Sequence, residues 1–388
     1  MVIRLIFFGM VLFLSACGNM GKGSSKASSS TSSPSNRMAV TIGTSSGCTY
    51  VNAPCTSVTI CVPNTSECQT VSGILVDTGS FGLRIFGNLL SVNLPNVSGS
   101  LGECAYFGSG ATWGSVSLAD LKLGGEPTIQ VPVQVINPAF GGQSVSNNPC
   151  GQTVFSAPSQ AGFNGIMGIG LVQYDCGSYC ATTTGNGAYF SCTSDTCSGT
   201  SASFGEQVSN PVFQFPSDNN GVLLTFPSTE LSGAPSVSGT LFFGIGTQSD
   251  NDVSGLTPYE ADSYLNVEVE FDGQNETSSF IDSGSNAWYF PNLPNLQVCS
   301  GSSWYCPSAV YSGSATIVGG SGNQGNFLFS VESEAITGAS GDQVIPSLGG
   351  EESSGTFDLG IPFFLGRSVA LGYVNQNSPL GFGPFWAF

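Results

Sequence analysis

The sequence of 388 residues contains no histidine. Without an imidazole, the chain cannot form a serine–histidine–aspartate triad, a cysteine–histidine pair or any metal site that needs a histidine ligand. Charged residues are also scarce, at 8% of the chain compared with about 25% in an average soluble protein. Patterns of long amphipathic helices are missing as well. The 53 glycines, 21 prolines and 40% hydrophobic residues instead indicate a turn-rich β protein long enough for two lobes.

The few basic residues are unevenly distributed. Four of the seven lysines and arginines precede residue 47, in a segment with no acidic residue, and only Arg84, Lys122 and Arg367 accompany the 25 acidic residues that follow. Such a surface repels phosphate groups, so we expect no nucleic-acid partner. The acidic excess is typical of a soluble exported protein. An alternative is tolerance of low pH, where the carboxylates become neutral.

The N-terminus has the layout of a secretory signal. Arg4 precedes an apolar run at residues 5–14 that is too short to be a stable membrane anchor. The run ends in Leu-Ser-Ala-Cys at Cys17, which resembles the lipobox of bacterial lipoproteins. The resemblance implies cleavage after Ala16 and a lipid on Cys17 that binds the membrane. The alternative is an ordinary signal peptide followed by a stray cysteine.

The resemblance to a lipoprotein also implies a location and a domain order. Because no aspartate follows Cys17 directly, a Gram-negative cell would place the protein in its outer membrane. Serine-rich sequence follows the cysteine and lacks an apolar period, as in a flexible tether. We therefore expect a signal peptide at residues 1–16 and a tether at 17–46.

The cysteines also agree with export. If Cys17 carries lipid, twelve cysteines remain, which predicts up to six disulfides. The sequence alone does not fix the connectivity. A four-thiolate zinc site at residues 176–197 has the wrong spacing and the wrong compartment, so we expect no metal. The local candidate pairs are Cys176 with Cys180, Cys192 with Cys197, and Cys299 with Cys306.

Short β-branched or aromatic runs, each bounded by glycine, proline, asparagine or serine, recur along the chain. They predict an all-β fold with a few short helical turns. The runs lie at residues 58–62, 74–76, 115–123, 129–136, 241–243, 265–271 and 369–374.

One motif occurs twice. Asp77 follows an apolar strand and precedes a threonine, a glycine and a serine, and Asp282 follows a similar strand and precedes Ser-Gly-Ser. A single copy is equally typical of a turn in which the aspartate caps backbone amides. Two copies, about one lobe apart, indicate a pair of aspartates that work together.

In this motif pair the sequence resembles the pepsin-like aspartic proteases, most closely an uncharacterised bacterial lipoprotein branch. The resemblance covers most of residues 55–388 and implies an all-β, bilobal fold with a cleft between two pseudo-twofold-related lobes. The first lobe is expected at residues 47–230 and the second at 231–388. Residues 163–170 resemble the element that threads behind the first aspartate, and residues 363–366 resemble its counterpart in the second lobe. The residues that resemble the flap and the wall of the substrate cleft are Tyr106, Phe107, Gly108 and Trp113, with core packing as the alternative for each aromatic side chain.

Two neighbouring carboxyl groups provide both an acid and a base. They cannot both ionise at close range, so Asp77 and Asp282 would share one proton, as the two aspartates of pepsin do. The ionised group would activate a water, and the protonated group would stabilise the developing oxyanion. This chemistry needs no cofactor. The resemblance further implies that the surrounding residues support the dyad, namely Thr78, Gly79, Ser80, Ser283, Gly284 and Ser285.

Some features depart from the family pattern. The spacing between Asp77 and Tyr106 is short, and Arg84 stands where pepsins usually carry an aromatic residue. Arg84 would either pair with a buried acid or bind a substrate carboxylate, and we favour the structural role.

Two functions from different classes fit these observations. The first is a monomeric aspartic endopeptidase, anchored at the bacterial envelope, that cleaves peptide or protein substrates. The second is a catalytically inactive lipoprotein that uses the same fold to bind a peptide or an envelope partner, because a fold alone does not determine function.

Overall fold

The computed structural model describes residues 36–388, which belong to one compact unit. The predicted signal peptide, the lipidation of Cys17 and most of the predicted tether lie outside these residues. The described chain is mostly β, with 42% of residues in strands and 9% in helices, so the all-β prediction is confirmed.

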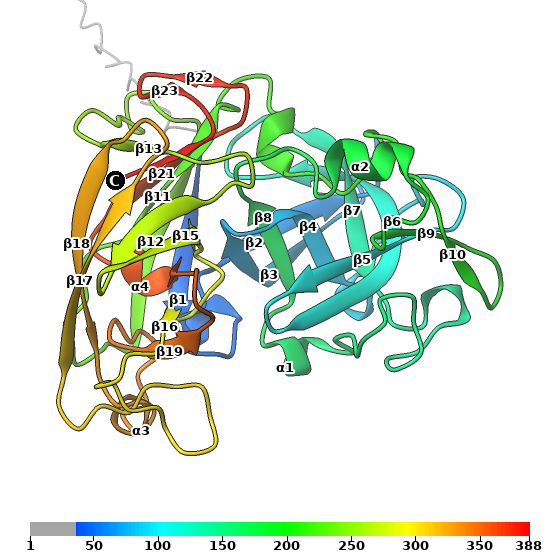
Figure 1. Ribbon diagram of the computed structural model, residues 1–388. Helices are drawn as coiled ribbons and strands as arrows, with labels where there is room; N and C mark the ends of the chain where they lie inside the picture. Colours follow the sequence, from blue (N-terminus) through cyan, green and yellow to red (C-terminus); the bar gives the residue numbers. More distant parts are fainter. Residues whose placement is uncertain (1–35) are drawn as a thin grey trace, which may run out of the picture. The chain divides into compact units, whose positions relative to one another are not determined.

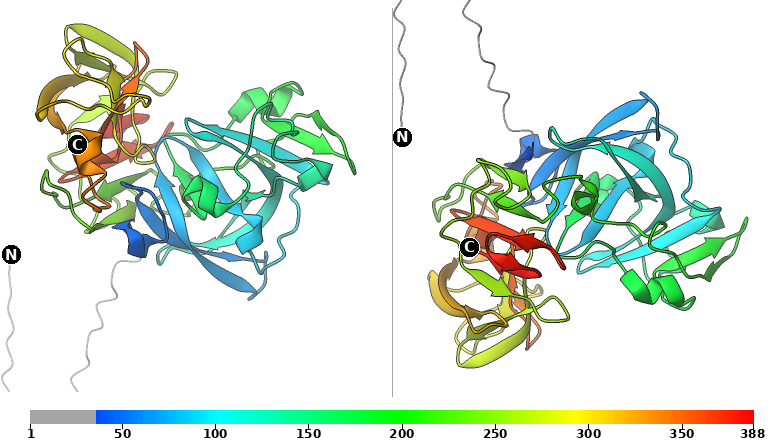
Figure 2. Two further views of the ribbon diagram at one scale, coloured as in Figure 1. Left: turned by 90° about the horizontal axis from the view of Figure 1, so that it is seen from below. Right: turned by 90° about the horizontal axis from the view of Figure 1, so that it is seen from above.

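Two sheets contain most of the strands (Figure 1). A sheet of 15 strands includes all strands of the first half and continues into the second half, and a sheet of seven strands lies within the second half. Both views in Figure 2 show β2–β10 on one side and β14–β20 on the other. The first-half strands are β1 (Arg37–Gly43), β2 (Cys55–Cys61), β3 (Cys68–Asp77), β4 (Phe81–Phe86), β5 (Leu101–Phe107), β6 (Gly110–Lys122), β7 (Ile129–Ile136), β8 (Gly165–Ile169), β9 (Tyr189–Cys192) and β10 (Cys197–Gly199).

Shorter strands and helical turns complete the second half. The strands are β11 (Gly221–Thr225), β12 (Ser236–Phe243), β13 (Pro258–Glu260), β14 (Val267–Phe271), β15 (Gln274–Ile281), β16 (Trp288–Pro291), β17 (Tyr311–Val318), β18 (Gln324–Val331), β19 (Gly349–Glu352), β20 (Asp358–Leu359), β21 (Ser368–Gly372), β22 (Asn377–Ser378), β23 (Gly381–Phe382) and β24 (Phe385–Ala387). The α-helices of the described chain are α1 (Pro158–Ala161), α2 (Gly177–Thr182), α3 (Glu334–Thr337) and α4 (Ile361–Phe364). None of the helices between residues 36 and 388 is long and apolar enough to span a membrane.

Strand β1 joins the two halves of the chain. It pairs antiparallel with β12 along its whole length, from Arg37 opposite Phe242 to Gly43 opposite Ser236. Val40 and Ile42 are fully buried, because alternate residues of this strand face the core. The predicted tether is therefore wrong at its end, where residues 37–43 form a strand of the folded unit.

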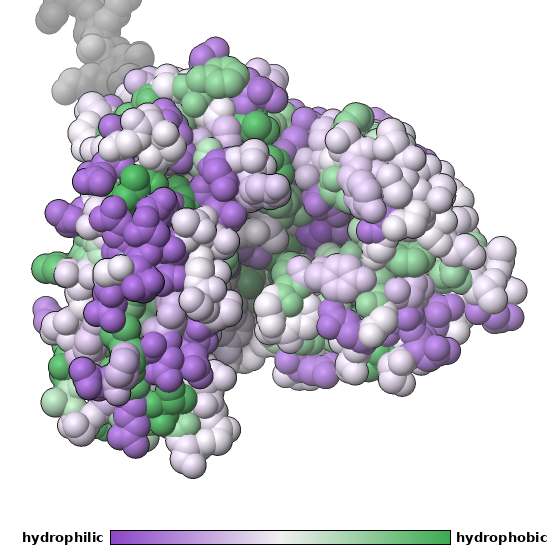
Figure 3. All heavy atoms as spheres, in the orientation of Figure 1, coloured by the Kyte–Doolittle hydropathy of each residue, from purple (hydrophilic) through white to green (hydrophobic). Residues whose placement is uncertain are grey.

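The predicted boundary between the lobes also differs from the pairing. Strand β11 lies before residue 230, yet it pairs with β12 and β21 of the second half. The two halves thus share one continuous sheet. The space-filling view shows a hollow in the molecular surface between the two halves (Figure 3).

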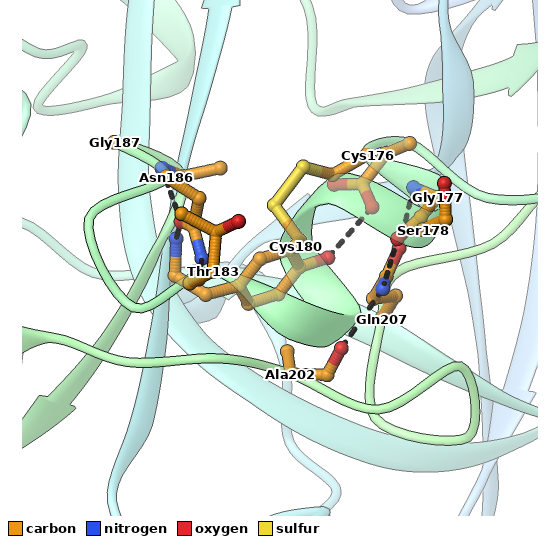
Figure 4. The surroundings of a disulfide bond; sticks show 12 residues. Cys176, Gly177, Ser178, Cys180, Thr183, Asn186, Gly187, Ala202 and Gln207 are labelled. Atoms are coloured by element: carbon orange, nitrogen blue, oxygen red, sulfur yellow. Dashed lines mark hydrogen bonds between the residues drawn. A yellow bond between two sulfur atoms is a disulfide. The ribbon is translucent and has the colours of Figure 1, made fainter.

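Six disulfides stabilise the loops and hairpins of the described chain, and the three local pairings expected from the sequence are among them. Figure 4 shows one of these, beside α2, where the Gln207 amide donates hydrogen bonds to the carbonyls of Gly177 and Ala202. This many disulfides is typical of exported proteins. The pairs are Cys48–Cys55, Cys61–Cys68, Cys104–Cys150, Cys176–Cys180, Cys192–Cys197 and Cys299–Cys306.

Candidate active site

Each aspartate of the repeated motif stands at the end of a strand. Strand β3 ends at Asp77 and pairs in parallel with β8, which places Asp77 opposite Gly168. Strand β15 ends just before Asp282 and pairs in parallel with β20, and the Asp282 N–H donates to the carbonyl of Leu359 at 3.0 Å. The same local arrangement therefore occurs twice, once in each half.

The second threading element differs from the prediction. Residues 357–360 lie beside Asp282, whereas residues 363–366 were expected there. Phe363 and Phe364 instead belong to helix α4 and are fully buried in the core. Both segments are mostly apolar and end in Leu-Gly, and the strand pairing identifies the one that lies beside Asp282.

Backbone and hydroxyl donors hold both carboxyl groups. The Gly79 N–H donates to Oδ1 of Asp77 at 2.8 Å and to Oδ1 of Asp282 at 3.1 Å. The Ser80 hydroxyl donates to Oδ2 of Asp77 at 2.6 Å. Because one N–H reaches both side chains, the two carboxyl groups face each other across a short distance.

The second motif repeats these contacts. The Gly284 N–H donates to Oδ1 of Asp282 at 2.7 Å, and the Ser285 hydroxyl donates to Oδ2 at 3.0 Å. A Cβ on Gly284 would lie 2.8 Å from the carboxyl carbon of Asp77, and one on Gly79 would lie 2.6 Å from that of Asp282. Only glycine leaves room for the carboxyl group from the other half.

A set of reciprocal hydrogen bonds fixes the two motifs relative to each other. The Thr78 N–H donates to the Ser283 hydroxyl oxygen at 3.1 Å, and the Ser283 N–H donates to the Thr78 hydroxyl oxygen at 2.8 Å. Each hydroxyl in turn donates to a carbonyl of the opposite strand, at Ile281 and at Val76. All four contacts are buried, so they hold the aspartates rigidly across the interface between the halves.

The carboxyl pair is arranged to hold a proton. Burial raises the pKa of Asp282 well above its usual range, and the negative charge of Asp77 raises it further. Asp77 is itself only 5% exposed. Two such neighbouring groups share one proton, which makes one of them an acid and the other a base.

A third carboxyl group, Asp358, lies next to the dyad and was missed in the sequence. It pairs with Phe280 in β15, whereas the corresponding residue of the first half, opposite Leu75, is Ile166. Burial raises the pKa of Asp358 strongly, a hydrogen bond with the Ser285 hydroxyl opposes this, and the charges of neighbouring acids add to the increase. The signal was an acidic residue inside an otherwise apolar segment.

The predicted flap is a hairpin formed by β5 and β6, with Gly108 in its turn. Tyr106 is 51% exposed, and its hydroxyl donates to the carbonyls of Cys150 and Gly187, both at 3.2 Å. Phe107 is partly buried, with the Arg84 guanidinium 5.9 Å from its ring centroid. Tyr106 and Phe107, which are neighbours in the strand, thus face opposite sides of the hairpin. The Tyr106 hydroxyl is hydrogen-bonded to backbone carbonyls that do not belong to the dyad motifs.

Trp113 is a core residue and not part of the cleft wall, so this prediction is wrong. Its side chain is fully buried, and its indole N–H donates to the carbonyl of Phe140 at 3.0 Å. The ring packs against Phe140 and Phe190. An aromatic residue in a strand next to a flap motif is equally typical of core packing, and here the disulfide between Cys104 and Cys150 lies in the same cluster.

Arg84 has the structural role that we favoured. It is buried and forms ion pairs with Glu103 and Asp175. Its remaining terminal nitrogen donates to the carbonyl of Phe81 at 2.7 Å. The guanidinium therefore neutralises buried acids beneath the flap hairpin and is not free to bind a substrate carboxylate.

The paired β halves and the aspartates between them define a pepsin-like fold. The crystal structure of an aspartic proteinase from Irpex lacteus is similar to this chain, with a TM-score of 0.51 and 16% identity. The similarity covers 91% of this chain and 96% of that one. At this identity it establishes the fold alone, and the bilobal prediction is confirmed.

The chain belongs to a family described as "Protein of unknown function (DUF3443)", whose model matches residues 32–388. No curated protein matches the chain.

Proposed function

We propose that the protein is an aspartic endopeptidase that hydrolyses peptide bonds with a water activated by Asp77 and Asp282. The observation that supports this most is the pair of carboxyl groups held by one shared N–H and by matching glycine and serine donors. A purely binding protein needs no such acid–base pair.

The residues divide the reaction between them. The ionised carboxylate accepts a proton from the water as the water oxygen attacks the amide carbonyl carbon. The protonated carboxyl group donates to the developing oxyanion, and a proton then reaches the leaving nitrogen as the C–N bond breaks. The Thr78 and Ser283 contacts keep both groups in place throughout, so little reorganisation is needed.

The location is part of the same proposal. Six disulfides favour an exported protein. The lipobox-like sequence at Cys17 supports a lipid anchor in the bacterial envelope, with the outer membrane as the expected site in a Gram-negative cell. Envelope peptides or proteins within reach of the tether would be the substrates.

An inactive peptide-binding lipoprotein is the second candidate. It is favoured by the Tyr106 hydroxyl, which is bound to the carbonyls of Cys150 and Gly187 and so does not close over the dyad. Such a protein would bind a peptide in the cleft and would not hydrolyse it.

The test is proteolysis of a denatured protein between about pH 3 and about pH 7, the range in which one proton can reside on the dyad. We expect cleavage by the wild type and a loss of at least about a hundredfold in the Asp77→Asn and Asp282→Asn variants, because each substitution removes one of the acid–base groups. The matched control is Asp195→Asn, at an exposed position outside the site. A folded wild type that cuts nothing, or an Asp77→Asn variant with full activity, would rule out the peptidase.

A further inference from the structure

A short loop that the family motifs do not include runs beside the dyad. Residues 48–55 are closed by the Cys48–Cys55 disulfide. At one end of the loop the Thr49 N–H donates to the carbonyl of Gly162 at 2.9 Å. At the other end the carbonyl of Pro54 accepts from the N–H of Val76, the residue before Asp77, at 2.8 Å. The loop is thus attached to the first half at two places close to the site.

Asn52 attaches the same loop to the second half. Its side-chain amide donates to the carbonyls of Asn286 and Ile345, both at 2.8 Å, and its side-chain oxygen accepts from the Ile345 N–H at 2.7 Å. Its backbone N–H donates to the carbonyl of Gln343 at 2.8 Å. Asn52 is fully buried, and its φ of 64° is in the left-handed region that asparagine tolerates better than most residues. The loop therefore bridges the two halves.

Tyr50 lies within this bridge, between the contacts to Gly162 and those to Asn286. Its ring is partly exposed and packs on the apolar cluster that also contacts Phe107 and Phe155. Burial and the negative charges of both Asp77 and Asp282 raise the pKa of its phenol.

The predicted flap tyrosine has a different environment. Burial alone raises the pKa of Tyr106, with no contribution from either aspartate of the dyad. Its hydroxyl is already bound to two carbonyls. The neighbours of Tyr50 are fixed on both sides of the site: Thr49 is bound to Gly162, and the carbonyl of Val51 accepts from the side-chain amide of Asn286, the residue after Ser285, at 3.4 Å. These contacts place Tyr50 beside the dyad, in agreement with the effect of both aspartates on its pKa.

We propose that Tyr50, and not Tyr106, is the tyrosine that contacts the substrate at the dyad, where it determines which residue fits beside the scissile bond. This inference rests on the proposed peptidase function. The hydroxyl is available as a hydrogen-bond donor to a substrate carbonyl, and the ring limits the space beside it. Because a disulfide and contacts to both halves hold the loop, the position of Tyr50 is preorganised.

The test compares Tyr50→Phe with Tyr106→Phe in the purified protein with its disulfides formed. We expect kcat/KM for a peptide substrate to fall about tenfold in Tyr50→Phe, in line with one lost hydrogen bond, and to change by less than about twofold in Tyr106→Phe. We expect Tyr50→Ala to move the cleavage sites in a denatured protein, mapped by mass spectrometry, toward bulkier neighbouring residues. A merely structural role would lower activity without moving the cleavage sites.

Other outcomes separate this inference from the proposed function. If the wild type cleaves and Asp77→Asn does not, but both tyrosine variants keep wild-type rates and cleavage sites, the role of Tyr50 is refuted and the peptidase stands. Faster cleavage by Tyr50→Ala with unchanged sites would identify Tyr50 as an obstruction and also refute its role. A folded wild type without activity refutes both proposals together.

Discussion

Asp358 shows how one side chain can alter the chemistry of a shared motif. In the first half the position two residues before the threading glycine Gly168 belongs to Ile166, and the corresponding position in the second half carries a buried carboxyl group. Its Oδ1 atom has no hydrogen-bond partner in the described chain. The groups that face it are Asp77, Asp282, Ser285, Tyr289 and Glu352.

We predict that Asp358→Asn moves the alkaline limb of the kcat/KM profile to lower pH. When Asp358 is ionised, its charge raises the pKa of Asp282, so the dyad retains its shared proton to higher pH. The amide has no charge, and the dyad then loses its proton earlier. The pH profile of peptide cleavage measures this shift, with Asp195→Asn as the control. An unchanged or upward-shifted limb would contradict the coupling.

Among individual residues of the site, the sequence predicts those of the repeated motif and few others. Both aspartates, their glycines and the hydroxyl residues lie where the motif and the resemblance place them. Tyr50 and Asp358 belong to no motif. The loop of Tyr50 is held at the site by hydrogen bonds to Gly162 and Asn286, and Asp358 by the pairing of β20 with β15. These are long-range contacts that local sequence does not encode.

Among the elements, β1 illustrates the limit of composition as a guide. The serine-rich sequence before it favours a tether, yet Met38, Val40 and Ile42 alternate with exposed positions as in a strand. The partner strand β12 lies about two hundred residues later in the chain, and nothing near β1 in the sequence indicates it. The same reason explains the wrong choice of threading element, since two segments of similar sequence that end in Leu-Gly are candidates for one position.

We predict that a chain beginning at residue 47 is much less stable than one beginning at residue 36. Removal of β1 exposes β12 and loses three buried side chains, which corresponds to about 5 kcal/mol or more of unfolding free energy. Thermal unfolding followed by circular dichroism measures the difference. The matched control starts at residue 36 and carries the same tag. Equal melting temperatures would show that β1 is dispensable.

The whole molecule combines an acidic surface with buried acids that favour their neutral form. Burial raises the pKa of Glu126 to about 7, and the nearby Asp218 adds to this. Burial also raises the pKa values of Asp282 and Asp358. In the unfolded chain these groups lose their protons at lower pH than in the folded chain, so the folded state binds more protons between the two pKa values.

We therefore predict that the protein becomes less stable as the pH rises. The contribution of Glu126 is complete below its pKa in the unfolded chain, near 4.5, and is lost as the pH increases through about 7. Repulsion within the acidic surface acts in the same direction. Melting temperatures between about pH 4 and about pH 8 measure the slope, and Glu126→Gln should reduce it. A higher melting temperature at pH 8 would contradict this assignment.

The pairing of β1 with β12 also sets an order of events during export. Of the strands in residues 36–388, β1 would emerge first from a translocation pore, and its pairing with β12 cannot form until the second half of the chain has emerged. Until then the N–H and C=O groups at the edge of β1 are unpaired and can bind strands of other chains. The Cys48–Cys55 and Cys61–Cys68 disulfides join cysteines that are seven residues apart, so they can form before β1 pairs with β12. The two aspartates meet only after the second half has arrived, so the proposed active site would form only after most of the chain has crossed the pore.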